Sequence, residues 1–432
     1  MDLKILKKKN ISAKITIPGD KSISHRAIIF SSLAKGKSKI KSLLEADDCR
    51  KTLQIMKDLG VKIHKNSSGV YIINGVGLYG LKEPKNILDC GNSGTAMRLL
   101  TGLLSAQNFY SVLSGDNSLR QRPMERIIKP LSKMGAEICS RKGFKAPLSI
   151  KGLEANKTLK AIKYELPMAS AQLKSSILLA ALYAKEKTVI KEPALSRDHS
   201  ERMLKAVGVD LIKDDKLITL NTAKSRTLKP LQMEIPGDIS SAAFFIVAAL
   251  ITEESKVILE NIGVNYTRSG FLDIIKEMGA NIEIINKRKN GGEEVADIIV
   301  KSSNLNAINI NGQIIPRLID EIPIIAVLAS QAKGKTVIKD AEELRVKETD
   351  RIKATVNELK KLGVNIKELA DGMIINGPNK IKGGITVKSY HDHRIAMALA
   401  ILALNTEKGL IIKNSEVIKT SFPQFLDIIK EI

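Results

Sequence analysis

The chain has 432 residues, of which 44% are hydrophobic and 3% aromatic, and its formal net charge is +23. This length exceeds what one hydrophobic core serves, so we expect two domains, and no apolar run reaches the roughly 18 residues that span a bilayer. Because lysine is scattered through every segment and tryptophan is absent, the charge fits a lysine-rich surface that attracts anionic small substrates better than it fits nucleic-acid binding.

The N-terminus and the cysteines bear on location. Residues 1–6 alternate as a strand does, which leaves no room for a secretory or transit peptide. Cys49, Cys90 and Cys139 are odd in number and lack the spacing of metal ligands, so they fit a reducing compartment. We therefore expect a soluble, cytoplasmic protein without a membrane or nucleic-acid partner.

Six passages along the chain share one pattern: a short strand, a polar or Gly/Pro-rich corner, an Ala/Ile/Leu-rich helix and another strand. The corners begin roughly 70–80 residues apart, a period that indicates a repeated supersecondary unit. In chain order they lie at residues 18–24, 91–95, 167–172, 236–241, 320–323 and 391–394. The first and fourth read PGDKSIS and PGDISS, and they mark the starts of two halves with three repeats each.

A second signal recurs where amphipathic helices end. Glycine follows the last apolar position at Gly60, Gly135, Gly208, Gly279 and Gly363. Only glycine adopts the left-handed conformation of a helix C-cap without penalty, so each is expected to close a helix. The sixth repeat is truncated and ends in a helix near residues 422–429. The sequence thus predicts an α/β fold of six βαβαβ(β) repeats.

The two similar corners also predict the domain boundaries. Because residues 20 and 236 open equivalent halves, the chain is expected to cross between domains near 19–20 and near 233–236. One domain then spans residues 20–233, and the other combines residues 1–19 with 234–432. Two crossings make a hinge, which can absorb domain closure.

The corners place unusual polar residues at helix starts. Unpaired backbone N–H groups and the helix macrodipole make these positions favourable for anions. The side chains there are Lys21, Ser22, Arg26, Asn92, Thr95, Arg98, Ser170, Gln172, Asp320, Glu321, His393 and Arg394. Taken singly, Ser22, Thr95 and Ser170 are better explained as helix N-caps. Their coincidence at one repeat position nevertheless favours an anion-binding site. His391 and His393 lack a third ligand nearby, so no metal is expected.

At these residues the chain resembles the 5-enolpyruvylshikimate-3-phosphate (EPSP) synthase family over nearly its whole length. The resemblance rests on PGDKSISHR (18–26), GNSGTAMR (91–98), QRPM (121–124), SAQLKS (170–175), LRVKETDR (344–351) and DHRIAM (392–397). It implies a transferase of the shikimate pathway of aromatic amino acid biosynthesis. Such an enzyme moves the enolpyruvyl group of phosphoenolpyruvate to the 5-hydroxyl of shikimate 3-phosphate and releases phosphate. It also implies an inverse α/β barrel of two domains, a cleft that closes on substrate, and a phosphoenolpyruvate site of the kind that glyphosate occupies in this family, whereas the sensitivity of this chain to glyphosate stays open.

This chemistry explains the polar residues. Both substrates are polyanions, which cations and N–H donors bind, and arginine suits bidentate contacts. During addition the 5-hydroxyl loses a proton while C3 of phosphoenolpyruvate gains one, and a tetrahedral intermediate then collapses by the reverse movements. At least one acid and one base are therefore needed, and no metal or organic cofactor is required.

Matched motif by motif, the resemblance implies roles for single residues. Lys21, Asp320, Glu348 and His393 are implied in catalysis, with Asp320 at the 5-hydroxyl and Glu348 as proton donor to the methylene carbon; which is acid and which is base stays open. The shikimate 3-phosphate residues are Lys21, Ser22, Arg26, Ser170, Gln172, Ser196, Asp320 and Lys347. The phosphoenolpyruvate residues are Lys21, Asn92, Gly94, Arg122, Gln172, Lys347, Arg351 and Arg394. The domain of residues 20–233 is expected mainly on the shikimate 3-phosphate side, and the other mainly on the phosphoenolpyruvate side.

Two positions depart from the family pattern. Ala171 stands where many relatives carry a second serine, so one phosphate hydrogen bond is missing or comes from Ser196 or Arg197. Thr420 stands where many relatives carry a lysine, and Lys419 precedes it, which leaves the role of Lys419 open.

Two other functions compete with this interpretation. A UDP-N-acetylglucosamine enolpyruvyl transferase typically carries a cysteine in a mobile loop, but residues 115–122 contain none. An RNA-processing enzyme on a similar repeat fold is disfavoured by the motifs at residues 347–351 and 392–394. We expect a monomer that acts on two small anionic substrates.

Overall fold

The computed structural model describes residues 2–154, 156–222 and 227–432. The chain divides into two compact units. Unit 1 comprises the N-terminal residues up to Pro18 together with Pro236–Arg288 and Glu294–Ile432. Unit 2 comprises Gly19–Ile235 and the short segment Lys289–Glu293.

Unit 2 contains three four-stranded sheets, one for each of the first three repeats. Their strands are β3 (Lys35–Lys41), β4 (Lys62–Lys65), β5 (Tyr71–Val76) and β14 (Gln232–Glu234); β6 (Leu88–Asp89), β7 (Ser111–Ser114), β8 (Glu137–Arg141) and β9 (Lys145–Lys151); and β10 (Lys163–Glu165), β11 (Thr188–Lys191), β12 (Asp210–Asp214) and β13 (Leu217–Asn221). Each sheet has one parallel pair, to which two further strands add antiparallel. The identical pattern in all three sheets is what duplication of one unit produces.

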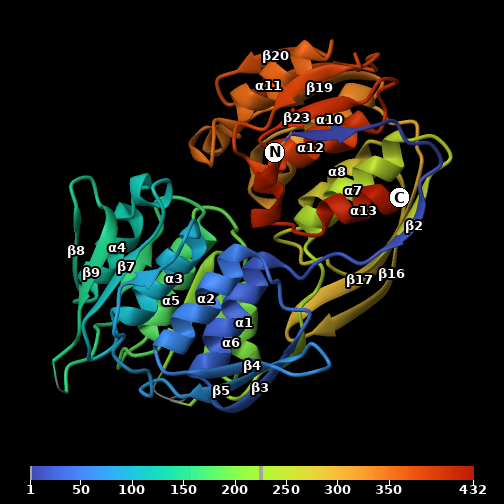
Figure 1. Ribbon diagram of the computed structural model, residues 1–432. Helices are drawn as coiled ribbons and strands as arrows, with labels where there is room; N and C mark the ends of the chain where they lie inside the picture. Colours follow the sequence, from blue (N-terminus) through green and yellow to red (C-terminus); the bar gives the residue numbers. More distant parts are fainter. Residues whose placement is uncertain (1, 155, 223–226) are drawn as a thin grey trace. The chain divides into compact units, whose positions relative to one another are not determined.

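The helices of unit 2 fall into two sets. Those that follow a corner are α1 (Lys21–Leu33), α3 (Gly94–Leu104) and α5 (Ala171–Ala181); the others are α2 (Asp47–Asp58), α4 (Glu125–Lys133), α6 (His199–Ala206) and the 3-10 helix η1 (Leu119–Gln121). The corner helices are buried almost throughout, and buried charged side chains such as Arg26 of α1 and Lys174 of α5 have hydrogen-bond or ion-pair partners. In Figure 1 the sheet with β7, β8 and β9 lies to one side of these helices, and the sheet with β3, β4 and β5 lies below them.

Unit 1 has two four-stranded sheets and one of three strands. The strands are β2 (Ser12–Ile15), β15 (Lys256–Gly263), β16 (Asn281–Asn290) and β17 (Glu293–Lys301); β18 (Asn309–Ile310), β19 (Gly334–Ile338), β20 (Asn365–Leu369) and β21 (Gly372–Gly377); and β1 (Leu3–Ile5), β22 (Ile385–Lys388) and β23 (Leu410–Lys413). The sixth repeat is short, as expected, and β1 from the N-terminus pairs antiparallel with β23 to complete its sheet.

The corner helices of unit 1 are again the buried ones. They are α7 (Ile239–Ile251), α10 (Ile322–Gln331) and α12 (His393–Ala403), and the remaining helices are α8 (Gly270–Glu277), α9 (Ile315–Leu318), α11 (Arg351–Lys361), α13 (Phe425–Glu431), η2 (Gly312–Ile314), η3 (Ile319–Glu321), η4 (Glu342–Val346) and η5 (Ser415–Thr420). Phe244 and Phe245 of α7 pack against Phe422 and Phe425, with ring centroids 5.5–6.0 Å apart. This aromatic cluster fixes the C-terminal helix against the core of unit 1.

The two halves of the sequence exchange their first strands. β2 precedes the first corner, yet it pairs in parallel with β15 of unit 1. β14 precedes the matching fourth corner, and it pairs in parallel with β3 of unit 2. The chain accordingly passes from unit 1 to unit 2 between Pro18 and Gly19, and it returns between Ile235 and Pro236.

The predicted glycine C-caps are confirmed. Gly60, Gly135, Gly208, Gly279 and Gly363 follow the ends of α2, α4, α6, α8 and α11, with φ between 90° and 95°. A side chain at these φ values would be strained, so the recurring glycine has a backbone cause.

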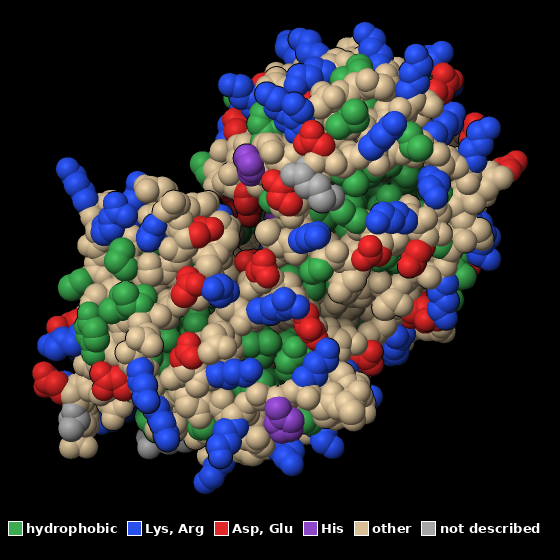
Figure 2. Space-filling view, in the orientation of Figure 1, with side chains coloured by type: hydrophobic (Ala, Val, Ile, Leu, Met, Phe, Trp, Pro, Cys, Tyr) green, Lys and Arg blue, Asp and Glu red, His purple; other side chains and the backbone are tan. Residues whose placement is uncertain are grey.

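The face of the molecule shown in Figure 2 carries many basic side chains. Lysine and arginine are scattered across the face seen in Figure 2, between acidic and uncharged residues. None of the helices in the described part of the chain has the length and apolar run that a bilayer crossing needs.

Candidate active site

In unit 2 the first corner is built around a buried arginine. Lys21 opens α1, and its Nζ lies 3.3 Å from a carboxylate oxygen of Asp48. One turn later Arg26 donates to the carbonyl of Ser22 at 2.8 Å, and to the hydroxyls of Ser175 and Ser200 at 2.7 Å each. Burial lowers the pKa of Arg26 to about 10. Arg26 thus ties the first corner to α5 and α6.

The N-cap interpretation holds for one of the three corner residues. Ser170 caps α5, since its hydroxyl accepts from the N–H of Leu173. It is wrong for Ser22 and Thr95, because Asp20 and Ser93 cap α1 and α3.

The second corner forms two hydrogen-bonded groups. Gln172 accepts from Arg98 at 2.5 Å and donates to Thr95 at 2.9 Å, which joins α5 to α3. Asn92 accepts from Arg122 at 2.8 Å and donates to Asp116 at 2.7 Å. Two predicted contacts of phosphoenolpyruvate, Asn92 and Arg122, are therefore adjacent, and Gly94 opens α3 beside them.

The third repeat holds a buried ionic triad that sequence reasoning missed. Nζ of Lys174 lies 2.9 Å from Glu192 and 2.7 Å from Glu201, and all three side chains are almost wholly buried. Burial disfavours the ammonium, but the two carboxylates outweigh it and raise the pKa of Lys174 above its usual value. Ser196 donates to the other oxygen of Glu192. The triad thereby supports the segment before α6, where Ser196 lies.

His25 predicts a pH-dependent stability. Its ring is buried and hydrogen-bonded to Thr52 at 2.7 Å, and burial lowers the pKa of His25 to about 3 against the opposing effect of Asp48. The unfolded chain therefore takes up a proton below about pH 6.5 that the folded chain refuses, so stability falls as the pH falls. In the wild type, His25 is expected to lower the free energy of unfolding by about 2 kcal/mol between pH 7 and pH 5. This part of the pH dependence should be absent from His25→Gln.

The measurement is chemical denaturation of both proteins at the two pH values. His64→Gln serves as the control, because His64 is exposed on β4. Equal pH dependence in wild type and His25→Gln would contradict the expectation.

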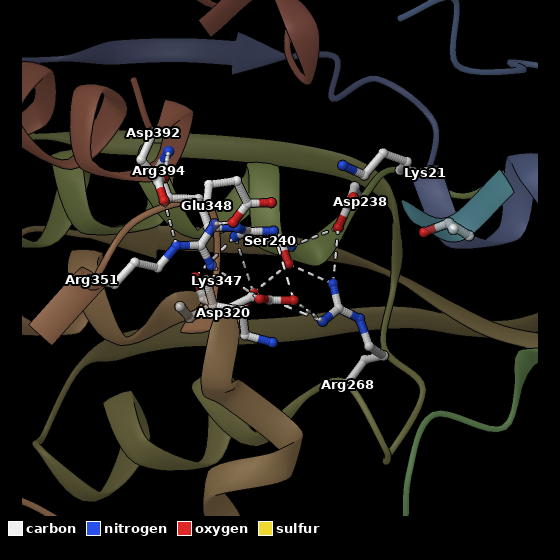
Figure 3. A network of polar contacts seen from close by, with 12 residues as sticks. Lys21, Asp238, Ser240, Arg268, Asp320, Lys347, Glu348, Arg351, Asp392 and Arg394 are labelled. Atoms are coloured by element: carbon white, nitrogen blue, oxygen red, sulfur yellow. Dashed lines mark hydrogen bonds and ion pairs between the residues drawn. The ribbon is translucent and has the colours of Figure 1, made fainter. Parts of the chain in front are cut away.

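In unit 1, Asp320 lies among arginines that converge from three segments (Figure 3). Nη1 of Arg351 is 3.3 Å from its Oδ1. Nη1 of Arg268 and Nη2 of Arg394 are each 4.0 Å from its Oδ2. Arg394 also donates to the backbone carbonyl of Asp320 at 3.0 Å. Positive charge on several sides favours the ionised carboxylate.

Arg351 opens α11 and is 2% exposed. Its nitrogens reach three carboxylates: Nε donates to Asp392 at 2.7 Å, Nη1 to Asp320 at 3.3 Å, and Nη2 to Glu348 at 2.6 Å. Burial opposes the charge, but the carboxylates outweigh it and raise the pKa of Arg351. Asp392 is also the N-cap of α12, so Arg351 joins two corners to Glu348.

Two further predicted residues of unit 1, Lys347 and His393, are sequence neighbours of Glu348 and Arg394. Lys347 follows η4 and pairs with Glu343 at 2.5 Å. His393 is the first residue of α12 and is buried. The structure thus brings Asp320, Glu348, Arg351 and Arg394 into one network.

Arg268 is the residue of this network that sequence reasoning missed. It stands two residues before α8, the same distance at which Arg197 precedes α6. Arg268 could have been found by comparing the residues before the second helix of each repeat, in addition to the corners before the first helix.

The arrangement suits proton transfer and the binding of anions. Carboxylates, which are chemically able to exchange protons, lie beside guanidinium groups, which can bind anions. Within the described residues, no three His, Cys, Asp or Glu side chains form a group that could hold a metal ion.

Comparisons with known proteins agree over the full length. A family model described as EPSP synthase (3-phosphoshikimate 1-carboxyvinyltransferase) matches residues 5–429. The chain is 51% identical over 433 residues to a 3-phosphoshikimate 1-carboxyvinyltransferase of Petrotoga mobilis, covering 100% of this chain and 99% of the relative. It is 52% identical over 428 residues to the protein of that name from Thermodesulfovibrio yellowstonii, covering 99% and 98%.

Two solved structures bear on the fold. The EPSP synthase of Acinetobacter baumannii matches with a TM-score of 0.91 at 45% identity, covering 100% of this chain and 98% of that one. The enolpyruvyl transferase NikO of Streptomyces tendae matches with a TM-score of 0.78 at 15% identity, covering 99% and 96%, and this likeness concerns the fold alone. The expected inverse α/β barrel of six repeats is confirmed.

Proposed function

Because the chain belongs to the EPSP synthase family, we propose that it transfers the enolpyruvyl group of phosphoenolpyruvate to the 5-hydroxyl of shikimate 3-phosphate and releases phosphate. The observation that carries this proposal is the family match over residues 5–429, which spans all six corner motifs. The protein is then a transferase of the shikimate pathway, which leads to the aromatic amino acids.

The reaction proceeds by addition and elimination. The 5-hydroxyl oxygen bonds to C2 of phosphoenolpyruvate while C3 takes up a proton, which gives a tetrahedral intermediate. Loss of a proton from C3 and of phosphate from C2 restores the double bond. One group must therefore accept the hydroxyl proton, and another must serve C3.

We assign Asp320 to the 5-hydroxyl. The guanidinium of Arg351 at 3.3 Å, with those of Arg268 and Arg394 at 4.0 Å, favours the ionised form. An ionised carboxylate can accept the hydroxyl proton, which fits the role of a base.

We assign Glu348 to C3. Its side chain is 30% exposed and lies 2.6 Å from Arg351, so it is ionised while that ion pair lasts. An anionic group of phosphoenolpyruvate that binds Arg351 competes with Glu348 for the guanidinium. Once displaced, Glu348 can take up a proton and deliver it to the methylene carbon. Substrate binding at Arg351 and the availability of the acid are thereby coupled.

The other roles follow the family motifs. Ser22, Arg26, Ser170, Gln172 and Ser196 bind shikimate 3-phosphate, and unit 2 mainly serves that substrate. Phosphoenolpyruvate is bound by Asn92, Gly94, Arg122, Lys347, Arg351 and Arg394, and Gln172 and Lys347 are assigned to both substrates. Lys21 contacts both substrates, and His393 orients or shares in proton transfer. The hydrogen bond from Arg122 to Asn92 supports their shared role.

Release of inorganic phosphate tests the activity. We expect phosphate only when shikimate 3-phosphate and phosphoenolpyruvate are both present, and none when shikimate replaces shikimate 3-phosphate. Phosphate release with UDP-N-acetylglucosamine and phosphoenolpyruvate would instead support the sugar-specific alternative.

Gly94→Ala is expected to weaken glyphosate inhibition markedly and to raise the KM for phosphoenolpyruvate less. Gly94 opens a helix, so alanine fits its backbone, but the new methyl carbon lies 2.9 Å from Nη1 of Arg98 and 3.5 Å from Nη1 of Arg122. Displaced arginine ends narrow the space for the longer inhibitor more than for the compact substrate. Inhibition curves at matched ratios of phosphoenolpyruvate to KM measure the effect, and an unchanged ratio of Ki to KM would contradict it.

We place the protein in the cytoplasm as a monomer without a nucleic-acid partner. Cys49, Cys90 and Cys139 are thiols rather than disulfides, which suits a reducing compartment, and the basic side chains visible in Figure 2 are scattered rather than clustered. Light scattering after gel filtration tests the monomer. Strong RNA binding that weakens steeply with salt would contradict the absence of a nucleic-acid partner.

A further inference from the structure

Arg268 is anchored to the start of α7. It is 3% exposed, and its Nη2 donates to the hydroxyl of Ser240 at 2.5 Å and to Oδ1 of Asp238 at 3.3 Å. Asp238 is the N-cap of α7. Two acceptors on a helix start therefore fix one edge of this guanidinium.

The other edge faces the acidic pair before α10. Nη1 of Arg268 lies 4.0 Å from Oδ2 of Asp320 and 4.0 Å from Oε1 of Glu321. Ser240 donates to the same oxygen of Glu321. Figure 3 shows Arg268 across from Arg351, with Asp320 between them. Arg268 thus links the fourth corner to the proposed base.

The equivalent corner of unit 2 has the opposite polarity. There the basic residue, Lys21, stands at the start of the first helix, and the acidic residue, Asp48, lies in the first turn of the second. In unit 1 the acidic residue, Asp238, stands at the start of the first helix, and the basic residue, Arg268, lies just before the second helix. The exchange leaves a positive charge beside Asp320.

We propose that Arg268 is a positioning residue for proton transfer: it keeps the carboxylate of Asp320 ionised and oriented while phosphoenolpyruvate occupies Arg351 and Arg394. This inference rests on the proposed role of Asp320. An anionic substrate shares the charge of the two arginines that it contacts, which weakens their hold on Asp320. Arg268 is buried and held by Ser240 and Asp238, so its guanidinium stays beside Asp320 when the other two arginines bind substrate.

The charges that face Asp320 set the pH dependence. The cations are Arg268 before α8, Arg351 of α11 and Arg394 of α12, and the nearby anions are Asp238, Glu321, Glu348 and Asp392. Removing one cation from a set in which anions predominate makes Asp320 easier to protonate. The acidic limb of the kcat–pH profile is then expected at higher pH in Arg268→Gln, whereas Arg268→Lys restores its position.

A double-mutant cycle in the full-length enzyme tests the inference. Arg268→Gln should lower kcat roughly 10–100-fold, which is less than loss of the proton-transfer group itself, with KM for both substrates within about threefold. In the Asp320→Asn background, Arg268→Gln should lower kcat by less than about twofold, because both residues act on one step. Arg317→Gln is the control: Arg317 is similarly buried and pairs with Asp273 at 2.6 Å.

Several results would overturn the proposal. They are a kcat within twofold of wild type in Arg268→Gln, losses that multiply in the double variant, or an equal loss in Arg317→Gln. If Arg268→Gln does not fold, Ser240→Ala removes an anchor of Arg268, and an unchanged kcat there would equally overturn it. Full turnover in Asp320→Asn would instead withdraw the role of Asp320, which distinguishes the two failures.

Discussion

Asp320→Asn and Glu348→Gln are each expected to lower kcat by roughly 10²–10⁴-fold with modest change in KM. Each substitution keeps size and hydrogen-bonding capacity while it removes the ability to exchange a proton. Each new amide can still accept hydrogen bonds from the arginines that surround Asp320 and from Arg351 beside Glu348. The loss therefore falls on the chemical step rather than on binding.

Steady-state phosphate release with each substrate varied in turn gives kcat and both KM values. Asp273→Asn is a matched control, because Asp273 pairs with the buried Arg317 in the same unit but lies outside the network of Asp320. Its kcat is expected within twofold of wild type. Near-full turnover in either test variant would withdraw that residue from catalysis, and a collapse of affinity would make it a binding group.

Lys174→Met is expected to destabilise unit 2 by about 3–5 kcal/mol. The substitution preserves much of the side-chain volume but leaves Glu192 and Glu201 buried with no cation between them. Two like charges in a poorly solvated site repel each other, and each also loses the partner that offset its desolvation. Ser196 loses support as well, since it donates to Glu192.

Thermal and urea unfolding measure this effect, with Lys129→Met as the control. Lys129 pairs with Glu125 at 2.7 Å on the exposed face of α4, and such pairs contribute little. Adding Glu192→Gln and Glu201→Gln to Lys174→Met should recover part of the lost stability, because the repulsion is then gone. A midpoint unchanged by Lys174→Met alone would mean that the triad does not hold its charges in the folded state.

The site was predictable from sequence where its residues share a local motif. Glu348 and Arg351 lie on one short segment, and Asp320 and Arg394 occupy equivalent corners. Their equivalent positions in the repeats predict that they lie near one another. Arg268 and Lys174, by contrast, do not share a local motif with the residues that they contact. Lys174 meets Glu192 and Glu201 through the packing of three successive elements, and no local pattern specifies which buried charges meet.

Helix caps and strand partners show the same limit. Asp20 and Ser22 are both good capping residues two positions apart, and only the start of α1 at Lys21 decides for Asp20. Alternating polarity indicates a strand at β2 but does not identify β15 as its partner, because pairing depends on the assembled sheet.

The exchange of first strands sets an order of assembly during synthesis. By residue 235 every strand of the three sheets of unit 2 has been made, so this unit can complete its sheets while the rest of the chain is still being added. The two strands of the N-terminal segment cannot pair until much later in synthesis, because Ser12 pairs with Lys256 and Leu3 pairs with Ile412.

A strand without its partner exposes backbone groups that can pair with another chain. Five of the first fourteen residues are lysines, and like charges on a waiting strand oppose such pairing between nascent chains. The basic character of this segment is therefore expected to disfavour pairing between nascent chains until the partner strands have been made.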